Sequence, residues 1–280
     1  MCCSAQATET AVFIAGRFLP KLPFVVRSIR TGVPQIVFED GDILVVDKPG
    51  GMVCHSAQRP EYGSVAEWLR ESGLQTPRMI NRLDRETSGL VVVAKNERAA
   101  KILGKAVMRR EIEKQYLAIC WGNFREASGV IDQPIAVGKN SVVYTKRVVD
   151  REAGKPSVTE FQVEQELHGF TVVRLKPRTG RAHQLRVHLA WLGHPIVGDK
   201  LYGPDETLYL QFIEKGVTTE MLDQLLMPRH ALHAESVSFR HPRSGERTEA
   251  CAALPEDMRT FIEEHSLPGR DRGLSRGERD

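Results

Sequence analysis

Short runs of β-branched and other apolar residues recur along this chain, and glycine- or proline-containing turns follow several of them. Residues 43–46 are such a run, ending at Asp47-Lys48-Pro49-Gly50-Gly51, and residues 90–94 are another. This pattern is typical of strands. Further strands are expected at residues 116–121, 141–149, 159–163 and 170–175, and within 230–253. Strands outnumber helices without strict alternation, which predicts an α+β fold with a mixed, largely antiparallel sheet flanked by helices and loops.

Three segments show helical features instead. Ser64 and Glu67 have the spacing of a capping box, in which both side chains bind backbone N–H groups at a helix start. Residues 97–110 carry apolar side chains at helical spacing. Residues 181–192 do the same, and Gly193 follows directly as a residue that commonly ends helices.

The two ends of the chain differ from its middle. Residues 1–35 have no strong period and contain several glycines and prolines, so we expect an N-terminal arm. Residues 259–280 should hold a helix end and then, from Leu267, a segment rich in arginine and acidic residues that is too polar to fold. The remaining residues, 36–258, are expected to form one domain.

Composition excludes several classes of protein. The formal net charge is only +3, and no apolar run approaches the ~20 residues of a membrane span. The five cysteines include no C-x-x-C pair, which excludes a cysteine-rich zinc module. Their odd number suits a reducing compartment. The start of the chain lacks the basic residues of a signal peptide, so we expect a cytoplasmic protein.

Positive charge is concentrated locally. Residues 174–186 contain five basic and no acidic residues, and residues 101–114 contain five basic and two acidic residues. Such stretches can neutralise phosphates even in a nearly balanced chain. A single basic stretch is nevertheless more often a solvated face, so neither stretch alone identifies a partner.

Asp84 lies in the segment NRLDRETSGLVVVAK, in a polar turn directly before a buried strand. Loops held by rigid strands often carry catalytic groups. An isolated loop aspartate usually only binds its own turn. Arg82 and Arg85 favour the functional interpretation, because a neighbouring arginine keeps a carboxylate ionised.

Arg186 lies within the third expected helix, at the flank of its buried stripe. An arginine in that position usually needs a carboxylate partner, and Asp84 is the natural candidate. Gly180 and Arg181 stand where this helix is expected to begin, and free N–H groups at a helix start attract phosphate.

Metal and nucleotide-cofactor sites are not indicated. His183 and His188 are five residues apart, about 140° around a helix axis, so they do not share a face. Ser88 is not in a G-x-S-x-G elbow. The glycine-rich phosphate-binding patterns are also absent, so no cofactor and no metal is expected.

Several segments, in order, resemble the motifs of the RluA-type RNA pseudouridine synthases. NRLDRETSGLVVVAKN resembles the family signature. ILVVDKPGGMVCHS, EKQYLAICWG, TGRAHQLRVHLAWLGHPIVGDKLYG and RHALHAESVSFRHPRSGE resemble its other motifs, from about Ile36 to about Met258. The resemblance implies a pseudouridine synthase catalytic domain over residues 36–258, without the N-terminal S4-type RNA-binding domain of many relatives. It also implies isomerisation of uridine in structured ribosomal or transfer RNA.

The resemblance implies roles for matched residues. Asp84 would be the essential carboxylate, paired with Arg186, that attacks or stabilises the sugar or base. Tyr116 would stack near the uracil and move a proton, and Arg82 would fill the gap left by the flipped uridine. Further RNA contacts are expected from Arg85, Arg178, Arg181 and His183.

One position departs from the family, which usually has histidine where this chain has Asn81. Asparagine can still form hydrogen bonds but cannot titrate near neutral pH, so we expect a structural role there and an active enzyme. Two alternatives stay open: an RNA-binding protein with this fold but no activity, and a carboxylate glycosidase, which needs a second acid beside Asp84. We expect a monomer that acts on structured RNA and not on membranes.

Overall fold

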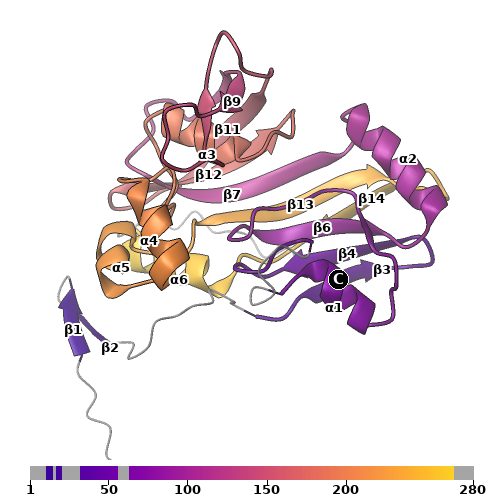
Figure 1. Ribbon diagram of the computed structural model, residues 1–280, viewed down its shortest axis with the longest axis horizontal. Coiled ribbons are helices and arrows are strands. Elements are labelled where there is room, and N and C mark those ends of the chain that lie inside the picture. Colours follow the sequence, from indigo (N-terminus) through magenta and orange to yellow (C-terminus); the bar gives the residue numbers. More distant parts are fainter. Residues whose placement is uncertain (1–10, 15–16, 21–31, 56–62, 268–280) are drawn as a thin grey trace, which may run out of the picture.

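The computed structural model describes residues 11–14, 17–20, 32–55 and 63–267. Its centre is a ten-stranded sheet in the order β3-β4-β6-β13-β7-β12-β11-β8, with β5 beside β6 and β14 beside β13 (Figure 1). These strands are β3 (Gln35–Glu39), β4 (Ile43–Lys48), β5 (Arg78–Met79), β6 (Ser88–Ala94), β7 (Glu113–Trp121), β8 (Ser128–Asp132), β11 (Val158–Glu166), β12 (Phe170–Pro177), β13 (Leu232–Arg240) and β14 (Arg247–Cys251). β13 and β6 pair in parallel, whereas the other pairs of this sheet are antiparallel, which confirms the predicted fold class.

Two hairpins and six helices complete the described part of the chain. The hairpins are β1 (Ala11–Ile14) with β2 (Arg17–Pro20), and β9 (Ile135–Val137) with β10 (Arg147–Val149). The helices are α1 (Val65–Glu71), α2 (Glu97–Met108), α3 (Gln184–Trp191), α4 (Thr207–Lys215), α5 (Thr219–Leu225) and α6 (Glu256–His265). The expected capping at Ser64 is confirmed, because its hydroxyl accepts the N–H of Glu67 at 3.1 Å. Sequence patterns did not predict α4 and α5.

The strand expected over residues 141–149 is wrong over its first part, since only β10 is extended. Ser141 Oγ and Lys146 Nζ both bind the carboxylate of Glu206, at 2.9 and 2.6 Å. The Lys146 N–H also donates to the carbonyl of Val143. These contacts fold residues 141–146 into a turn despite their strand-like composition.

The ends of the chain contain the elements β1 and β2 and the helix α6. The other residues of the expected N-terminal arm up to residue 31, and the predicted disordered tail from residue 268, lie outside the described residues. Within the described ranges, no helix has the length and apolar character needed to cross a membrane.

The β4–β6 half of the sheet is covered on both faces. Leu83 and α1 pack with Val91 and Val93 on one face. Leu103 of α2 packs with Leu90 and Val92 on the other. Successive side chains of a strand point to opposite faces, so the loop that contains Leu83 lies on the face opposite α2.

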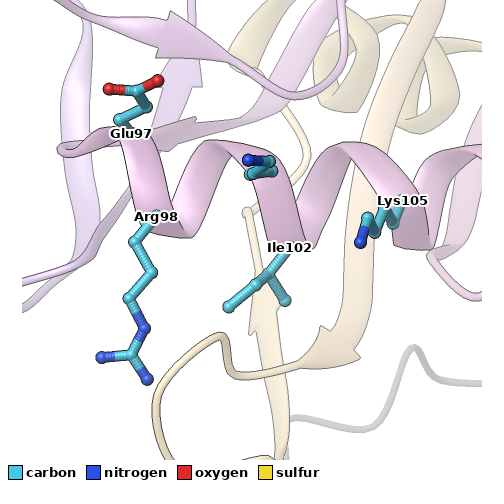
Figure 2. Close-up of a pocket in the computed structure, with 5 residues that line it drawn as sticks. Glu97, Arg98, Ile102 and Lys105 are labelled. Atoms are coloured by element: carbon cyan, nitrogen blue, oxygen red, sulfur yellow. The ribbon is translucent and has the colours of Figure 1, made fainter.

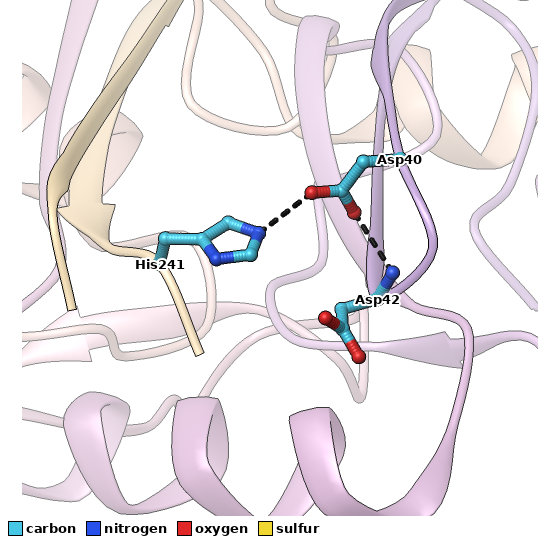
Figure 3. Close-up of side chains that lie close together, drawn as sticks. All are labelled: Asp40, Asp42 and His241. Carbon is cyan, nitrogen blue, oxygen red and sulfur yellow. Dashed lines mark hydrogen bonds and ion pairs between the residues drawn. The ribbon is translucent and has the colours of Figure 1, made fainter. Parts of the chain in front are cut away.

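A polar cluster fixes the end of the sheet beside α2 (Figure 3). His241 contacts Asp40 at 2.7 Å, and the Asp40 carboxylate also accepts the N–H of Asp42. Asp42 in turn binds Arg243 and the side chain of Asn96, which caps the start of α2. These contacts hold the turn between β3 and β4 against the end of β13, so the three clustered side chains have structural partners.

Gly89 marks the closest approach of β6 to β13. Its φ angle is 106°, and a Cβ added there would lie 2.3 Å from the carbonyl oxygen of Ala234. Only glycine adopts such a backbone conformation readily and leaves that space free. Gly104, in the middle of α2, has open space around it and no such requirement.

Gly89→Ala should therefore lower the free energy of unfolding by roughly 1–3 kcal/mol or more, because a methyl group must displace backbone. Gly104→Ala is the matched control and should raise it by up to about 1 kcal/mol, since alanine favours a helix interior. Urea unfolding followed by circular dichroism measures both. Equal midpoints for the two variants would contradict the close approach of β6 and β13.

Candidate active site

The loop that carries Asp84 connects β5 to β6. Hydrogen bonds join it to the end of β4 and to the segment that follows β4. The carbonyl of Arg85 accepts the N–H of Gly51 at 2.9 Å and the ammonium of Lys48 at 3.1 Å. The N–H of Leu83 donates to the Cys54 thiol sulfur at 3.3 Å. The residues directly before and after Asp84 are therefore both hydrogen-bonded to residues 48–54.

Lys48 is completely buried, and its ammonium also donates to the carbonyls of Pro49 and Met52 at 2.9 Å each. Burial lowers the pKa of Lys48 to about 7. Three carbonyl acceptors compensate for the loss of water around this group. The lysine joins the turn after β4 to the loop of Asp84.

Arg186 links two carboxylates that come from different parts of the chain. Its Nη1 donates to Oδ2 of Asp84 at 2.9 Å, which is the pair predicted from the sequence. Its Nε and Nη2 donate to Asp199 at 2.6 and 2.8 Å. The side chain of Asp199 is fully buried, whereas that of Asp84 is 31% exposed. Asp84 is therefore the member of this triad that can meet a ligand.

Asp199 is the residue that sequence reasoning missed. Its Oδ1 also accepts the N–H groups of Leu201 and Tyr202, at 3.0 Å each. Burial alone raises the pKa of Asp199, but the Arg186 guanidinium outweighs it and lowers that pKa well below its usual range. One signal for this residue was present in the sequence. Gly198 and Asp199 lie in the same segment as α3, TGRAHQLRVHLAWLGHPIVGDKLYG, and their residue types indicate a turn.

Tyr202 and His183 form the wall beside this triad. The Tyr202 ring centre lies 4.9 Å from Cζ of Arg186, and its hydroxyl accepts the N–H of Arg147 at 2.9 Å. Nδ1 of His183 lies 2.8 Å from the same hydroxyl. His183 has a φ of 57° and does not cap α3 with its side chain, which instead faces Tyr202. Burial lowers the pKa of His183, while the negative charge of Asp84 opposes this.

Tyr116 lies on β7 and is buried. Burial, and then the negative charge of Asp84, raise the pKa of Tyr116 above the ordinary value for a phenol. The hydroxyl of Tyr116 consequently keeps its proton at neutral pH. It can donate a hydrogen bond, but it is a poor proton acceptor.

The two arginines that flank Asp84 differ in exposure. Arg82 is exposed. Arg85 is half-buried, with its guanidinium 4.6 Å from the ring centre of Phe212 and 3.4 Å from the Glu86 carboxylate. Arg82 is therefore the flanking cation that is open to a ligand.

Much of the basic stretch 174–186 is engaged within the protein. Arg174 pairs with Glu164 and Glu235. Arg178 is exposed but binds both oxygens of Glu160, at 2.7 and 2.9 Å.

Arg181 is exposed and donates to the carbonyl of Pro156 at 3.3 Å. The residues predicted to contact RNA therefore differ in accessibility. Arg82 and Arg181 are exposed, Arg178 is exposed but paired with Glu160, and Arg85 and His183 are half-buried.

The second basic stretch begins within α2, whose side chains Arg98, Ile102 and Lys105 extend from the helix in Figure 2. With Glu97 and Lys101 they line a pocket along the helix. Because α2 covers the face opposite the Asp84 loop, this pocket is separate from the candidate site.

Asn81 binds the backbone of β6 through both ends of its amide. Nδ2 donates to the carbonyl of Leu90 at 3.1 Å, and Oδ1 accepts the N–H of Val92 at 2.8 Å. These bonds support the structural role expected for this position.

The arrangement offers one partly exposed carboxylate, oriented by a buried arginine and close to a protonated phenol. A carboxylate held in this way can attack an electrophilic carbon or stabilise positive charge that develops beside it.

Comparison with known proteins gives consistent results. The family model for RNA pseudouridylate synthase matches residues 42–191. Ribosomal large subunit pseudouridine synthase D of Vibrio parahaemolyticus is 38% identical over 249 residues, which cover 84% of this chain and 73% of that protein. The uncharacterized RNA pseudouridine synthase YlyB of Bacillus subtilis is 36% identical over 237 residues, 82% of this chain and 72% of that protein.

Two solved human structures share the fold. RNA pseudouridylate synthase domain containing 1 superposes with a TM-score of 0.63 at 30% identity, covering 80% of this chain and 84% of the human chain. RNA pseudouridylate synthase domain containing 4 superposes with a TM-score of 0.62 at 25% identity, covering 85% and 93%.

The contrast between the two acids gives a stability prediction. Asp199→Asn should lower the free energy of unfolding by ~3–5 kcal/mol, because a buried ion pair loses one partner. Asp84→Asn should cost at most ~1 kcal/mol, since that carboxylate is partly solvated. Urea unfolding at pH 7 measures both, and similar losses would contradict the assignment of Asp199 as the structural partner.

The lowered pKa of Asp199 also predicts that the stability of the protein depends on pH. The pKa of Asp199 is lower in the folded protein than its ordinary value of ~3.9, so its stabilising contribution is complete above that value and falls as the pH drops below it. The acid-side decline in stability should therefore be shallower in Asp199→Asn than in the parent protein. Unfolding measured between pH 2 and 5 checks this, and parallel declines would contradict it.

Proposed function

The chain belongs to the RNA pseudouridylate synthase family, and from this membership and the site geometry we propose that it isomerises specific uridines of structured ribosomal RNA. It is an isomerase that acts on RNA. The Vibrio relative is named for the large ribosomal subunit, which favours that RNA over transfer RNA as the substrate.

One observation carries the proposal: Arg186 holds the partly exposed carboxylate of Asp84 at 2.9 Å. In the proposed reaction the bond between uracil and ribose breaks while Asp84 attacks or stabilises the sugar or base. The detached uracil rotates and rejoins the ribose through a ring carbon instead of the nitrogen. That carbon loses its proton as the new bond forms, and the released nitrogen gains a proton, so the product is an isomer of the substrate and no other reactant is consumed.

The uridine must leave its RNA stack before it can reach Asp84, since the reacting atoms are shielded in a folded RNA. The exposed Arg82, two residues from Asp84, would occupy the vacated position. Tyr116 would stack near the uracil and donate a hydrogen bond from its protonated hydroxyl. The remaining predicted contacts, Arg85, Arg178, Arg181 and His183, would surround the entry to the site.

Residues 36–258 would form the catalytic domain. The protein would act as a monomer. A ribosomal RNA substrate is consistent with a location in the cytoplasm.

Pseudouridine mapping tests the proposal directly. Ribosomal and transfer RNA from cells with and without the gene should differ at one or a few uridines. Purified protein should restore the modification in unmodified transcripts. Identical maps, together with no pseudouridine in transcripts, would overturn the proposal in favour of an inactive RNA-binding protein.

Asp84→Asn should abolish isomerisation and leave RNA binding nearly intact, because the change removes the charge and nucleophile but almost no volume. Asp132→Asn, at an exposed acid on β8, is the control and should retain full activity. Pseudouridine formation by Asp84→Asn at more than a few per cent of the parent rate would rule out the proposed role.

Tyr116→Phe should lower kcat about 100-fold or more, as expected when a positioned proton donor is lost. The KM for RNA should change little, because the ring that stacks is retained. A steady-state comparison with the parent enzyme separates the two effects. An unchanged kcat would leave Tyr116 with a stacking role alone.

A further inference from the structure

The hairpin formed by β9 and β10 carries an aromatic residue that is almost fully exposed. Residues 138–146 connect the two strands, and within them the side chains of Val142 and Tyr144 are 63% and 88% exposed. An aromatic ring in contact with water makes no contribution to a core. Its place on the molecule therefore decides what it can do.

The tip of this hairpin is anchored and not free to move as a loop. Val143, between the two exposed residues, is buried and packs with Tyr202 and Val187. Ser141 and Lys146 are both bound to Glu206, as described above. The backbone on either side of Tyr144 is thus fixed, so little conformational entropy remains to be lost when its ring binds a ligand.

Tyr202, against which Val143 packs, belongs to the wall of the candidate site. The Tyr202 hydroxyl accepts the N–H of Arg147, the first residue of β10, and its ring lies against the Arg186 guanidinium that holds Asp84. The hairpin also lies beside α3 (Figure 1). Val143 packs with Tyr202, so Tyr144, the next residue, lies on a segment that adjoins the wall of the candidate site.

We propose that Tyr144 stacks on an unpaired base of the substrate RNA, adjacent to the uridine that enters the site. This rests on the proposed function, because it assigns a recognition element to the same site. Stacking on aromatic side chains is the common way in which proteins bind unpaired bases. Tyrosine provides a large contact area with only two rotatable side-chain bonds. The exposed Lys139 on the same connection supplies positive charge for the flanking phosphates.

Binding of a defined probe tests the stacking surface without requiring turnover. The probe is a fluorescein-labelled RNA hairpin with a loop of seven uridines, and a blunt duplex of the same stem is the comparison. Tyr144→Ala should weaken hairpin binding roughly 5- to 150-fold, the range given by base–aromatic stacking. Tyr144→Phe should bind within about 2-fold of the parent, since the ring is kept. Duplex binding should be unchanged in both variants, because a duplex offers no unpaired base.

Ile36→Ala is the control for loss of an exposed apolar side chain. Ile36 lies on β3, the edge strand at the opposite end of the sheet order from β8, and is 48% exposed. This variant should bind the hairpin as the parent does. Equal hairpin affinities for Tyr144→Ala and the parent would overturn the inference, and so would an equal loss on the duplex. Failure of the parent protein to bind the hairpin at all would also overturn it.

Pseudouridine formation in ribosomal RNA transcripts is measured in parallel, so the two proposals can fail separately. If the parent forms pseudouridine but Tyr144→Ala binds normally, only the stacking role is wrong. If Tyr144→Ala loses hairpin binding but the parent modifies no transcript, the stacking surface stands and the proposed function is wrong.

Discussion

The guanidinium of Arg186 is a buried cation, and the geometry of the site follows from how its charge is neutralised. An unpaired charge in the interior is strongly unfavourable, so the fully buried Asp199 binds the guanidinium through two hydrogen bonds. Asp199 is itself fixed by the N–H groups of Leu201 and Tyr202. One guanidinium nitrogen is left to donate elsewhere, and Asp84 lies 2.9 Å from it. The direction of the exposed carboxylate is therefore set from inside the protein.

A second buried basic side chain, that of Lys48, binds the same loop. The Lys48 ammonium donates to three backbone carbonyls, one of which is that of Arg85, directly after Asp84. Side-chain and backbone contacts thus act on neighbouring positions of one short loop. A catalytic group held in this way needs little reorganisation when its substrate arrives, which is the main requirement for electrostatic catalysis. The loop leads directly into β6, a strand in which every residue is buried, which gives it a rigid support.

Part of the sheet could be predicted from local patterns in the sequence, whereas the Asp84–Arg186 pair, 102 residues apart, could be predicted only because a buried arginine needs an acid and Asp84 was the candidate. The apolar run at residues 90–94 identifies a buried strand, and an arginine on a helix flank requires an acid. Asp199 was missed because the chain turns back after α3 and brings this residue into contact with Arg186. A spacing of 13 residues in the sequence does not predict such a contact. The strand over residues 141–149 was overpredicted for a similar reason, since Glu206, distant in sequence, folds its first part into a turn.

Runs of basic residues in the sequence overstate the positive surface available to RNA. In residues 174–186, Arg174 and Arg178 are neutralised by glutamates and Arg186 is buried with its acids. The other run begins on α2, on the face away from Asp84. Among the described residues, Arg82 is an exposed cation that flanks Asp84. In the proposed function, the shape of the RNA and its unpaired bases would contribute to recognition. The anchored hairpin beside Tyr202 is placed for that kind of contact.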